Sequence, residues 1–250
     1  MRNSKEYYLE KYSRQIIMEQ VGVHGQKKIL DSSICIVGCG GLGTSAAQYL
    51  SMSGIGKLIL IDHDSIILSN LNRQTLFTEK DIGASKCKIL SENIKKINKS
   101  IIVDYHKKKI DKNNIEVYLG NYPIILDCTD NFESRLIINK FCHNKKKILV
   151  SAALQNFDIQ AFIFSSWSNK KNPCYKCIFP NLTSDENLSC DEMGIMASVA
   201  GLGGIIQANL ALNHILELKS NFKELILLDS LKLDIKKIKI EKNKNCKICG

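Results

Sequence analysis

The glycine-rich segment Gly38-Cys-Gly-Gly-Leu-Gly43 constrains the fold of this chain more than any other feature. It follows a short β-branched run over residues 33–37 and precedes a helical pattern over 44–52. Strand, glycine turn and helix form the first unit of a parallel α/β sheet, and the glycines let backbone N–H groups approach a phosphate. The segment predicts a nucleotide site, with a tight turn lacking a ligand as the alternative. It does not choose between NAD and ATP.

The remaining patterns predict how the sheet continues. We expect further strands over 57–61, 101–105, 124–126 and 148–150, with helices over 86–96 and 131–144. After residue 151 the pattern changes to an antiparallel strand over 159–164, a long apolar stretch over 193–216 and a hairpin over 224–228 and 232–240. The fold class predicted is α/β, with a Rossmann-like sheet that is mainly parallel and has an antiparallel C-terminal extension. We divide this single domain into an N-terminal helical segment 1–30, a nucleotide-binding half 31–150 and a metal-bearing half 151–250.

The apolar stretch over 193–216 could span a membrane, but its polar residues favour a buried, glycine-rich core helix. The N-terminus has no apolar segment typical of a signal peptide. Ten cysteines without an export signal favour a reducing, cytoplasmic location, where cysteines are metal ligands or catalytic thiols more often than disulfides. We expect no membrane association.

Polar residues follow several of the predicted strands. Asp62 ends the second strand at a position suited to ribose hydroxyls, and Asp130 with Asn131 follows the strand over 124–126. Ser69-Asn70-Leu-Asn-Arg73-Gln74 and Lys86 lie between these strands. A carboxylate with nearby cations suits Mg²⁺-triphosphate chemistry, which a hydride-transfer site would not need.

Two Cys-x-x-Cys pairs stand far apart in the sequence. Four thiolates in two such pairs suit tetrahedral structural zinc, which would attach the C-terminal tail to the domain. A redox dithiol and a zinc-ribbon nucleic-acid module are the alternatives. The predicted zinc ligands are Cys174, Cys177, Cys246 and Cys249. Cys35, Cys39, Cys87, Cys128 and Cys142 fall in apolar or helical patterns and are expected in the core.

Taken together, these motifs resemble the MoeB/ThiF family, the bacterial activating enzymes of ubiquitin-like sulfur carriers. The resemblance also includes Ser13-Arg14-Gln15-Ile16 and Asp127-Cys-Thr-Asp-Asn131, and it extends from about residue 12 to residue 250. It implies that Gly38, Gly40, Gly41 and Gly43 form the loop against the ATP phosphates and that Asp62 binds the ribose. It further implies nucleotide contacts from Ser69, Asn70, Arg73, Lys86, Asp130 and Asn131.

The resemblance also implies a mechanism and partners. The C-terminal glycine carboxylate of a carrier of the ThiS or MoaD type, ending in Gly-Gly, attacks the α-phosphorus of ATP and releases pyrophosphate. Arg73 and Lys86 stabilise charge, and Asp130 coordinates Mg²⁺. Arg14 reaches the phosphates of the neighbouring subunit, which implies a homodimer, and Cys190 forms a covalent link or persulfide in some members. Because the chain ends after its last cysteine pair, we expect sulfur from a separate protein such as a cysteine desulfurase.

Two other function classes compete with this adenylyltransferase, namely an NAD-dependent oxidoreductase and a non-catalytic nucleotide- or nucleic-acid-binding protein. The net charge of +10 alone would favour a polyanion partner, but ATP and an acidic carrier tail are sufficient anions, so we expect no nucleic acid. Among the 35 basic residues the only arginines are Arg2, Arg14, Arg73 and Arg135. Arginine offers a bidentate fork that lysine lacks. The resemblance implies that Arg14 and Arg73 contact triphosphate, whereas Arg135 is expected to make a structural contact. Ser13 and residues 76–78 favour the ThiF side of the family, but they do not decide between the thiamine and molybdopterin pathways.

Overall fold

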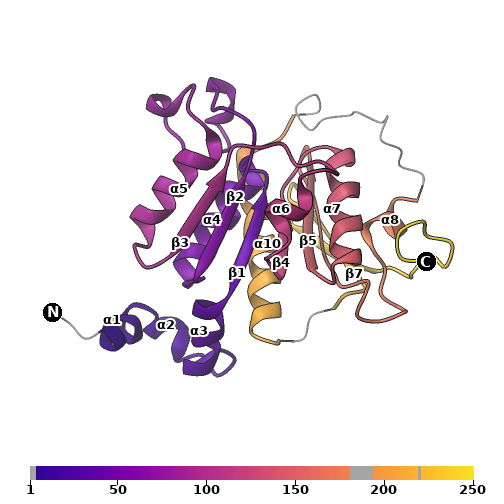
Figure 1. The fold of residues 1–250 in the computed structure, drawn as a ribbon, viewed down its shortest axis with the longest axis horizontal. Helices are drawn as coiled ribbons and strands as arrows, with labels where there is room; N and C mark the ends of the chain where they lie inside the picture. Colours follow the sequence, from indigo (N-terminus) through magenta and orange to yellow (C-terminus); the bar gives the residue numbers. More distant parts are fainter. Residues whose placement is uncertain (1–3, 181–193, 219–220) are drawn as a thin grey trace.

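One eight-stranded sheet runs through the whole chain, and helices cover both of its faces (Figure 1). The computed structural model describes residues 4–180, 194–218 and 221–250. The strand order is β3-β2-β1-β4-β5-β6-β7-β8. The strands are β1 (Ser33–Val37), β2 (Lys57–Ile61), β3 (Ile102–His106), β4 (Ile124–Asp127), β5 (Ile148–Gln155), β6 (Asp158–Phe164), β7 (Glu224–Asp229) and β8 (Asp234–Lys239).

The helices form two layers around this sheet. One face is covered by α4, α5 and α10, and the other by α6, α7 and the short α8. The α-helices are α1 (Ser4–Lys11), α2 (Ser13–Ile16), α3 (Gly22–Asp31), α4 (Gly41–Ser53), α5 (Lys86–Ile97), α6 (Ile115–Leu119), α7 (Phe132–Asn144), α8 (Tyr175–Ile178) and α10 (Ala197–Ile215). Two 3₁₀ turns, η1 (Leu68–Asn70) and η2 (Glu79–Asp81), connect β2 to α5.

The predicted fold class is confirmed. Strands β1 to β5 are parallel, and β5 to β8 are joined by antiparallel pairings. The predicted strand over 148–150 is too short, because β5 continues to Gln155 and pairs with all of β6. Asn156 lies in the turn of this hairpin with φ +52°, a left-handed conformation that asparagine tolerates. Residues 152–155 lack the β-branched pattern that marks the earlier strands, so pairing with β6 decides their conformation.

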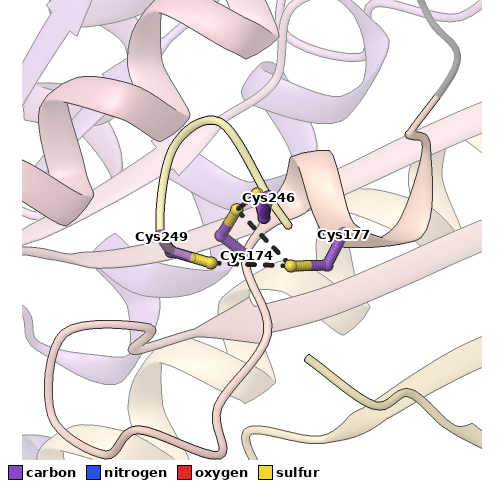
Figure 2. Close-up of side chains that lie close together, drawn as sticks. All are labelled: Cys174, Cys177, Cys246 and Cys249. Atoms are coloured by element: carbon purple, nitrogen blue, oxygen red, sulfur yellow. Dashed lines mark hydrogen bonds between the residues drawn. The ribbon is translucent and has the colours of Figure 1, made fainter. Parts of the chain in front are cut away.

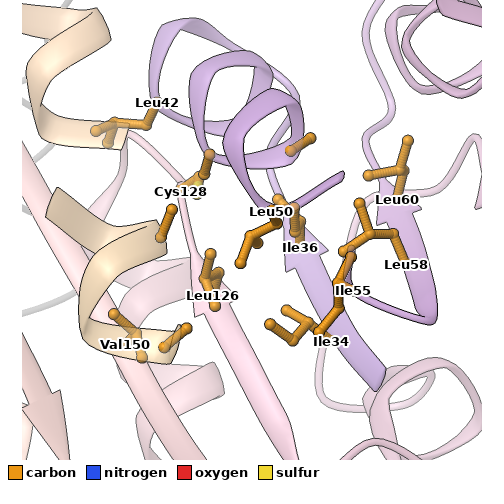
Figure 3. Close-up of a cluster of buried hydrophobic side chains, with 14 of the residues drawn as sticks. Ile34, Ile36, Leu42, Leu50, Ile55, Leu58, Leu60, Leu126, Cys128 and Val150 are labelled. Atoms are coloured by element: carbon orange, nitrogen blue, oxygen red, sulfur yellow. The ribbon is translucent and has the colours of Figure 1, made fainter. Parts of the chain in front are cut away.

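The largest part of the core lies between the sheet and α4, α5 and α10 (Figure 3). Strands β1 and β2 are buried on both faces, which explains why they read as continuous apolar runs rather than alternating ones. Ile34 and Ile36 of β1 pack beside Leu58 and Leu60 of β2, and Leu50 of α4 covers them. Burial of this kind stabilises a fold by roughly 25 cal/mol per Å² of apolar surface.

Helix α10 fills the predicted role of a glycine-rich core helix. It packs against α4 through Gly203 and Gly204, where an added Cβ would come within 2.8 Å of neighbouring atoms. The hydroxyl of Ser45 on α4 donates to the carbonyl of Gly201 at 2.8 Å and links the two helices. In the part of the chain that the structure describes, no helix combines the length and hydropathy needed to cross a membrane.

Candidate nucleotide and metal sites

A cleft that is open to solvent lies at the carboxyl ends of the parallel strands. Ligands bind at this edge in open α/β sheets. Segments that are distant in the sequence meet here, and Leu154 and Ala200 of the C-terminal half complete the wall. Of the predicted site residues, those that line the cleft are Gly38, Gly40, Gly41, Asp62, Asn70, Arg73, Lys86, Asp130 and Asn131.

The glycines of the loop have different tasks. Gly38 has φ +96° and lies so close to the carbonyl of Cys128 that any Cβ would collide with it. Gly43 is outside the cleft lining, and a Cβ there would meet the Gly38 carbonyl. The first turn of α4 has no acidic residue and no side-chain cap, and its first residues Gly41 and Leu42 line the cleft beside Gly40. This arrangement suits a phosphate.

Asp62 organises the glycine loop as well as lining the cleft. Its carboxylate accepts the backbone N–H of Cys39 at 2.6 Å and that of Asp64 at 2.8 Å. Burial raises the pKa of Asp62, while the two backbone hydrogen bonds and the charge of Lys86 oppose the increase. Each oxygen has a lone pair beyond the one that accepts a backbone N–H, so the predicted ribose contact is compatible with this geometry.

Lys86 forms an ion pair that the sequence analysis did not include. Its ammonium lies 2.8 Å from the carboxylate of Asp64, and the lysine side chain is only 8 % exposed. Asp64 also lines the cleft. The spacing Asp62-x-Asp64 at the end of β2 is a signal that could have identified it, because residues two apart at a strand end share one face.

Asn70 is the last residue of η1, and Arg73 lies in the turn that follows. Asn70 is buried, and its side-chain oxygen accepts the N–H of Ile67 at 3.2 Å, which fixes the turn. Arg73 donates to the carbonyl of Ser69 at 3.0 Å and to the side chain of Asn72 at 3.2 Å. Ser69 itself is exposed and outside the cleft lining, and its carbonyl accepts a hydrogen bond from Arg73.

The opposite wall of the cleft is the turn between β4 and α7. Asp130 is exposed there and accepts a hydrogen bond from the Asn131 amide at 3.3 Å. The Asn131 oxygen caps α7 by accepting the N–H of Ser134 at 2.9 Å. An exposed carboxylate at the mouth of an anion-binding cleft is the oxygen ligand that Mg²⁺ prefers.

Arg135 has the structural contacts expected of it. The guanidinium is 3 % exposed and donates to the carbonyl of Ala152 at 2.8 Å, to the carbonyl of Thr129 and to the hydroxyl of Ser151. These bonds tie α7 to β5 and to the turn after β4. The side chain also lines the cleft, so it supports the wall that carries Asp130.

Within one chain the structure does not bring Arg14 to the cleft. Arg14 is exposed on α2 and is outside the cleft lining. Helices α1 to α3 lie together at the end of the sheet where β1 begins, opposite the carboxyl end (Figure 1). Cys190 lies outside the described residues.

The four predicted zinc ligands converge on one point (Figure 2). Cys174 and Cys177 flank the start of α8, and Cys246 and Cys249 come from the C-terminal loop. Their sulfurs lie within 4.8 Å of one another, with 3.6 Å from Cys174 to Cys246 and 3.5 Å from Cys177 to Cys249. Tetrahedral zinc with Zn–S bonds of about 2.3 Å separates its sulfurs by about 3.8 Å, so the cluster fits zinc.

Hydrogen bonds among the thiols lower the pKa of Cys177 and raise the pKa of Cys174 and of Cys249. The cluster without a cation therefore keeps protons on some of its sulfurs, and metal binding has to release them because metal ligation requires thiolates. The remaining described cysteines, expected in the core, are all buried, and burial raises the pKa of each of these thiols.

Comparison with known proteins agrees with this geometry. Residues 12–248 match the ThiF family. The chain is 32% identical to the sulfur carrier protein adenylyltransferase of Thermus thermophilus over 100% of this chain and 93% of that protein. It is 31% identical to the molybdopterin-synthase adenylyltransferase of Salmonella typhimurium, covering 96% of each.

Longer and more distant proteins extend the comparison. The chain is 35% identical to the adenylyltransferase and sulfurtransferase MOCS3 of Xenopus laevis over 96% of this chain, and spans 53% of that protein's length. The crystal structure of E. coli MccB superposes with a TM-score of 0.84 at 24% identity over 100% of this chain and 74% of that one, which supports the fold alone. On the match that runs from the N-terminal helices to the last cysteine pair, the chain belongs to the ThiF family.

Proposed function

We propose that this protein uses ATP and Mg²⁺ to adenylylate the C-terminal glycine of a ubiquitin-like sulfur carrier protein. The observation that carries the proposal is the cleft itself. A glycine loop, two cations and a carboxylate from four separate segments face one cavity at the carboxyl edge of the sheet. An NAD-dependent oxidoreductase would use the glycine loop but would leave Lys86, Arg73 and Asp130 without a task.

The reaction needs no nucleophilic side chain. The carrier's terminal carboxylate attacks the α-phosphorus, the bond from this phosphorus to the bridging oxygen breaks, and pyrophosphate leaves with the electron pair. The protein contributes position and charge stabilisation. Asp62 holds the ribose, the glycine loop and Asn70 hold the phosphates, and Arg73 and Lys86 stabilise the charge that develops on the leaving group.

Two metals complete the proposal. Mg²⁺, held by Asp130 and phosphate oxygens, would neutralise charge on the triphosphate. Zinc, held by the four clustered cysteines, would be structural, because all four positions of a tetrahedral site are taken by thiolates and none remains for a substrate.

The proposal extends to partners and location. We infer a homodimer in which Arg14 of each subunit serves the other subunit's triphosphate, and a separate sulfur donor such as a cysteine desulfurase. Cys190 is proposed to reach the acyl-adenylate. We place the enzyme in the cytoplasm, where ten cysteines remain reduced. The relatives carry names from sulfur-carrier and molybdopterin chemistry, and a carrier of either the ThiS or the MoaD type fits the site.

Carrier-dependent exchange of pyrophosphate into ATP tests the function. The protein is assayed with one ThiS-type and one MoaD-type carrier, and exchange is expected with at least one of them. Asp130→Ala should abolish exchange without unfolding the protein. Glu133→Ala is the matched control, since it removes an exposed carboxylate from the same region of α7 outside the cleft lining. Absence of exchange with both carriers would refute the proposal.

A further inference from the structure

Gln74 is the residue of the Ser69–Gln74 motif that the proposed reaction leaves without a task. Both polar groups of its main chain have hydrogen-bond partners. Its N–H donates to the carbonyl of Asn70 at 3.0 Å, and its carbonyl accepts the N–H of Phe77 at 3.2 Å. The residue is 2 % exposed, and among residues 4–180, 194–218 and 221–250 no group donates a hydrogen bond to its Oε1 atom. A buried carbonyl oxygen without a donor is costly, so a missing ligand is the natural explanation.

The side chain belongs to the wall of the cleft. Gln74 lines the cavity together with Gly40 and Gly41, and a Cβ built on Gly40 would lie 3.7 Å from the Gln74 Nε2 atom. On the same side, Gly41 is so close to Ala200 of α10 and to the Arg73 carbonyl that a Cβ would be within 3.3 Å of both. The amide therefore lies where the glycine loop approaches the C-terminal half of the chain.

The chemistry of the two substrates distinguishes which of them could satisfy Oε1. The triphosphate beside the glycine loop offers only acceptor oxygens, which would repel a carbonyl oxygen. The ribose hydroxyls and the adenine amine are donors too, but the Asp62 carboxylate is available for the ribose, and the adenine is separated by the ribose from the phosphates that the glycine loop faces. A peptide backbone offers N–H donors, and Leu154 and Ala200 add apolar side chains to the cleft lining that suit the carrier's peptide tail.

We propose that Gln74 Oε1 accepts a backbone N–H of the carrier's C-terminal Gly-Gly and so orients the terminal carboxylate toward the α-phosphorus. This inference rests on the proposed function and names the substrate group that Gln74 recognises. Because the acceptor is buried, the hydrogen bond discriminates strongly against a tail that lacks the donor.

The test combines a variant with a modified carrier. Gln74→Met keeps the length of the side chain and removes the acceptor. In semisynthetic carriers, glycolic acid replaces either the last or the penultimate glycine, so that an ester oxygen replaces one N–H while the carboxylate remains. We measure carrier-dependent ATP–pyrophosphate exchange for each combination, and thermal unfolding of each variant. Gln48→Met on α4, outside the cleft lining, is the matched control.

One ester carrier should lower kcat/KM of the wild-type protein about tenfold, as the loss of a buried hydrogen bond predicts. Gln74→Met should show a similar loss with the unmodified carrier, no further loss with that ester, and an unchanged KM for ATP. The control should behave as wild type. If Gln74→Met does not fold, the two ester carriers still test the wild-type protein.

Several results would overturn the inference while exchange itself persists. The inference is refuted if the wild-type protein uses both ester carriers as well as it uses the unmodified carrier. It is also refuted if each ester lowers kcat/KM by the same factor in the wild-type and Gln74→Met proteins. A defect of Gln74→Met confined to the KM for ATP would assign the amide to the nucleotide instead. Absence of exchange with unmodified carriers would refute the proposed function, and this inference with it.

Discussion

Asp64 and Lys86 form the most buried ion pair at the cleft among the described residues, and their environment gives it a defined pH dependence. Partial burial alone would raise the pKa of Asp64, but the hydrogen bond and charge of Lys86, with smaller contributions from His63 and Lys107, make the net shift downward. A carboxyl whose pKa is lowered by folding stabilises the protein above its unfolded pKa. That contribution is lost as the pH falls through the folded pKa.

We therefore expect Asp64→Asn to be less stable than the wild-type protein at pH 7, with a difference that shrinks as the pH falls from about 5 to about 3. Urea unfolding at a series of pH values measures this difference. Glu92→Gln is the control, because its exposed contact with Lys88 spans 4.0 Å and contributes little to stability. A constant difference between Asp64→Asn and wild type over the whole range would contradict the ion pair as its source.

The residues that sequence reasoning left without a role share one property. The spacing Asp62-x-Asp64 could have placed Asp64 at the cleft, but no local pattern specifies that its partner is Lys86 or that the Gln74 oxygen has no partner. In the structure, Asp64 is marked by its ion pair with Lys86, which lies 22 residues away in the sequence. Gln74 is marked by a side-chain oxygen at the cleft wall that accepts no hydrogen bond from the described residues. The glycine loop and the cysteine pairs, in contrast, are marked by their spacing, and the structure places Gly38, Gly40 and Gly41 at the cleft and the four cysteines in one cluster.

At the scale of elements, the contact between α4 and α10 positions the glycine loop, because α4 begins at that loop. Gly204 of α10 lies against α4 so closely that a Cβ would be 2.4 Å from the Leu42 carbonyl. We expect Gly204→Ala to force the helices apart and to destabilise the protein by about 1–3 kcal/mol. Denaturant unfolding measures the change.

Gly201 on the same helix provides the control for this substitution. A Cβ at this position would meet nothing within 4 Å, so Gly201→Ala should be neutral or stabilising by up to about 1 kcal/mol through helix propensity. Equal destabilisation by both variants would show that the glycines matter for helix flexibility rather than for the close approach to α4.

The cysteine cluster is the second element-scale contact, since it joins the C-terminal loop to α8. We expect the purified protein to contain stoichiometric zinc, and Cys246→Ser to lose the metal and unfold at a lower temperature. Elemental analysis and thermal unfolding, with and without a chelator, measure both effects. Lys247→Ser is the control, because it changes an exposed residue inside the same Cys-x-x-Cys pair. Zinc retained by Cys246→Ser would exclude this cluster as its site.

At the scale of the whole molecule, the centre of the parallel half of the sheet could be predicted because β1 is followed by a glycine turn and β2 and β4 are followed by acidic residues. The C-terminal half could not be predicted in the same detail. The extension of β5 to Gln155 depends on pairing with β6, and the packing of α10 on α4 depends on space left by Gly203 and Gly204. Both are set by neighbours in space rather than in sequence.

Arg14 poses the last question at this scale, because within one chain it lies away from the cleft that carries Asp130. If Arg14 serves the site of a second subunit, each site combines Asp130 of one chain with Arg14 of the other chain. A substitution of Arg14 and a substitution of Asp130 therefore affect the same site only when they lie on different chains. A mixed dimer of Arg14→Ala and Asp130→Ala subunits then has one site with both defects and one site with neither.

We expect each variant alone to be inactive in carrier-dependent exchange, and their co-expressed mixture to recover about a quarter of wild-type activity, since half of the dimers are mixed and half of the sites in these are intact. Co-expressed Lys86→Ala and Asp130→Ala should recover nothing, because both residues line the cleft of the same chain and every site of the mixed dimer keeps one defect. Recovery in the second mixture would point to contamination or reversion. Failure in the first, with sedimentation confirming a dimer, would place Arg14 outside the active site and leave its exposed position on α2 as a surface feature.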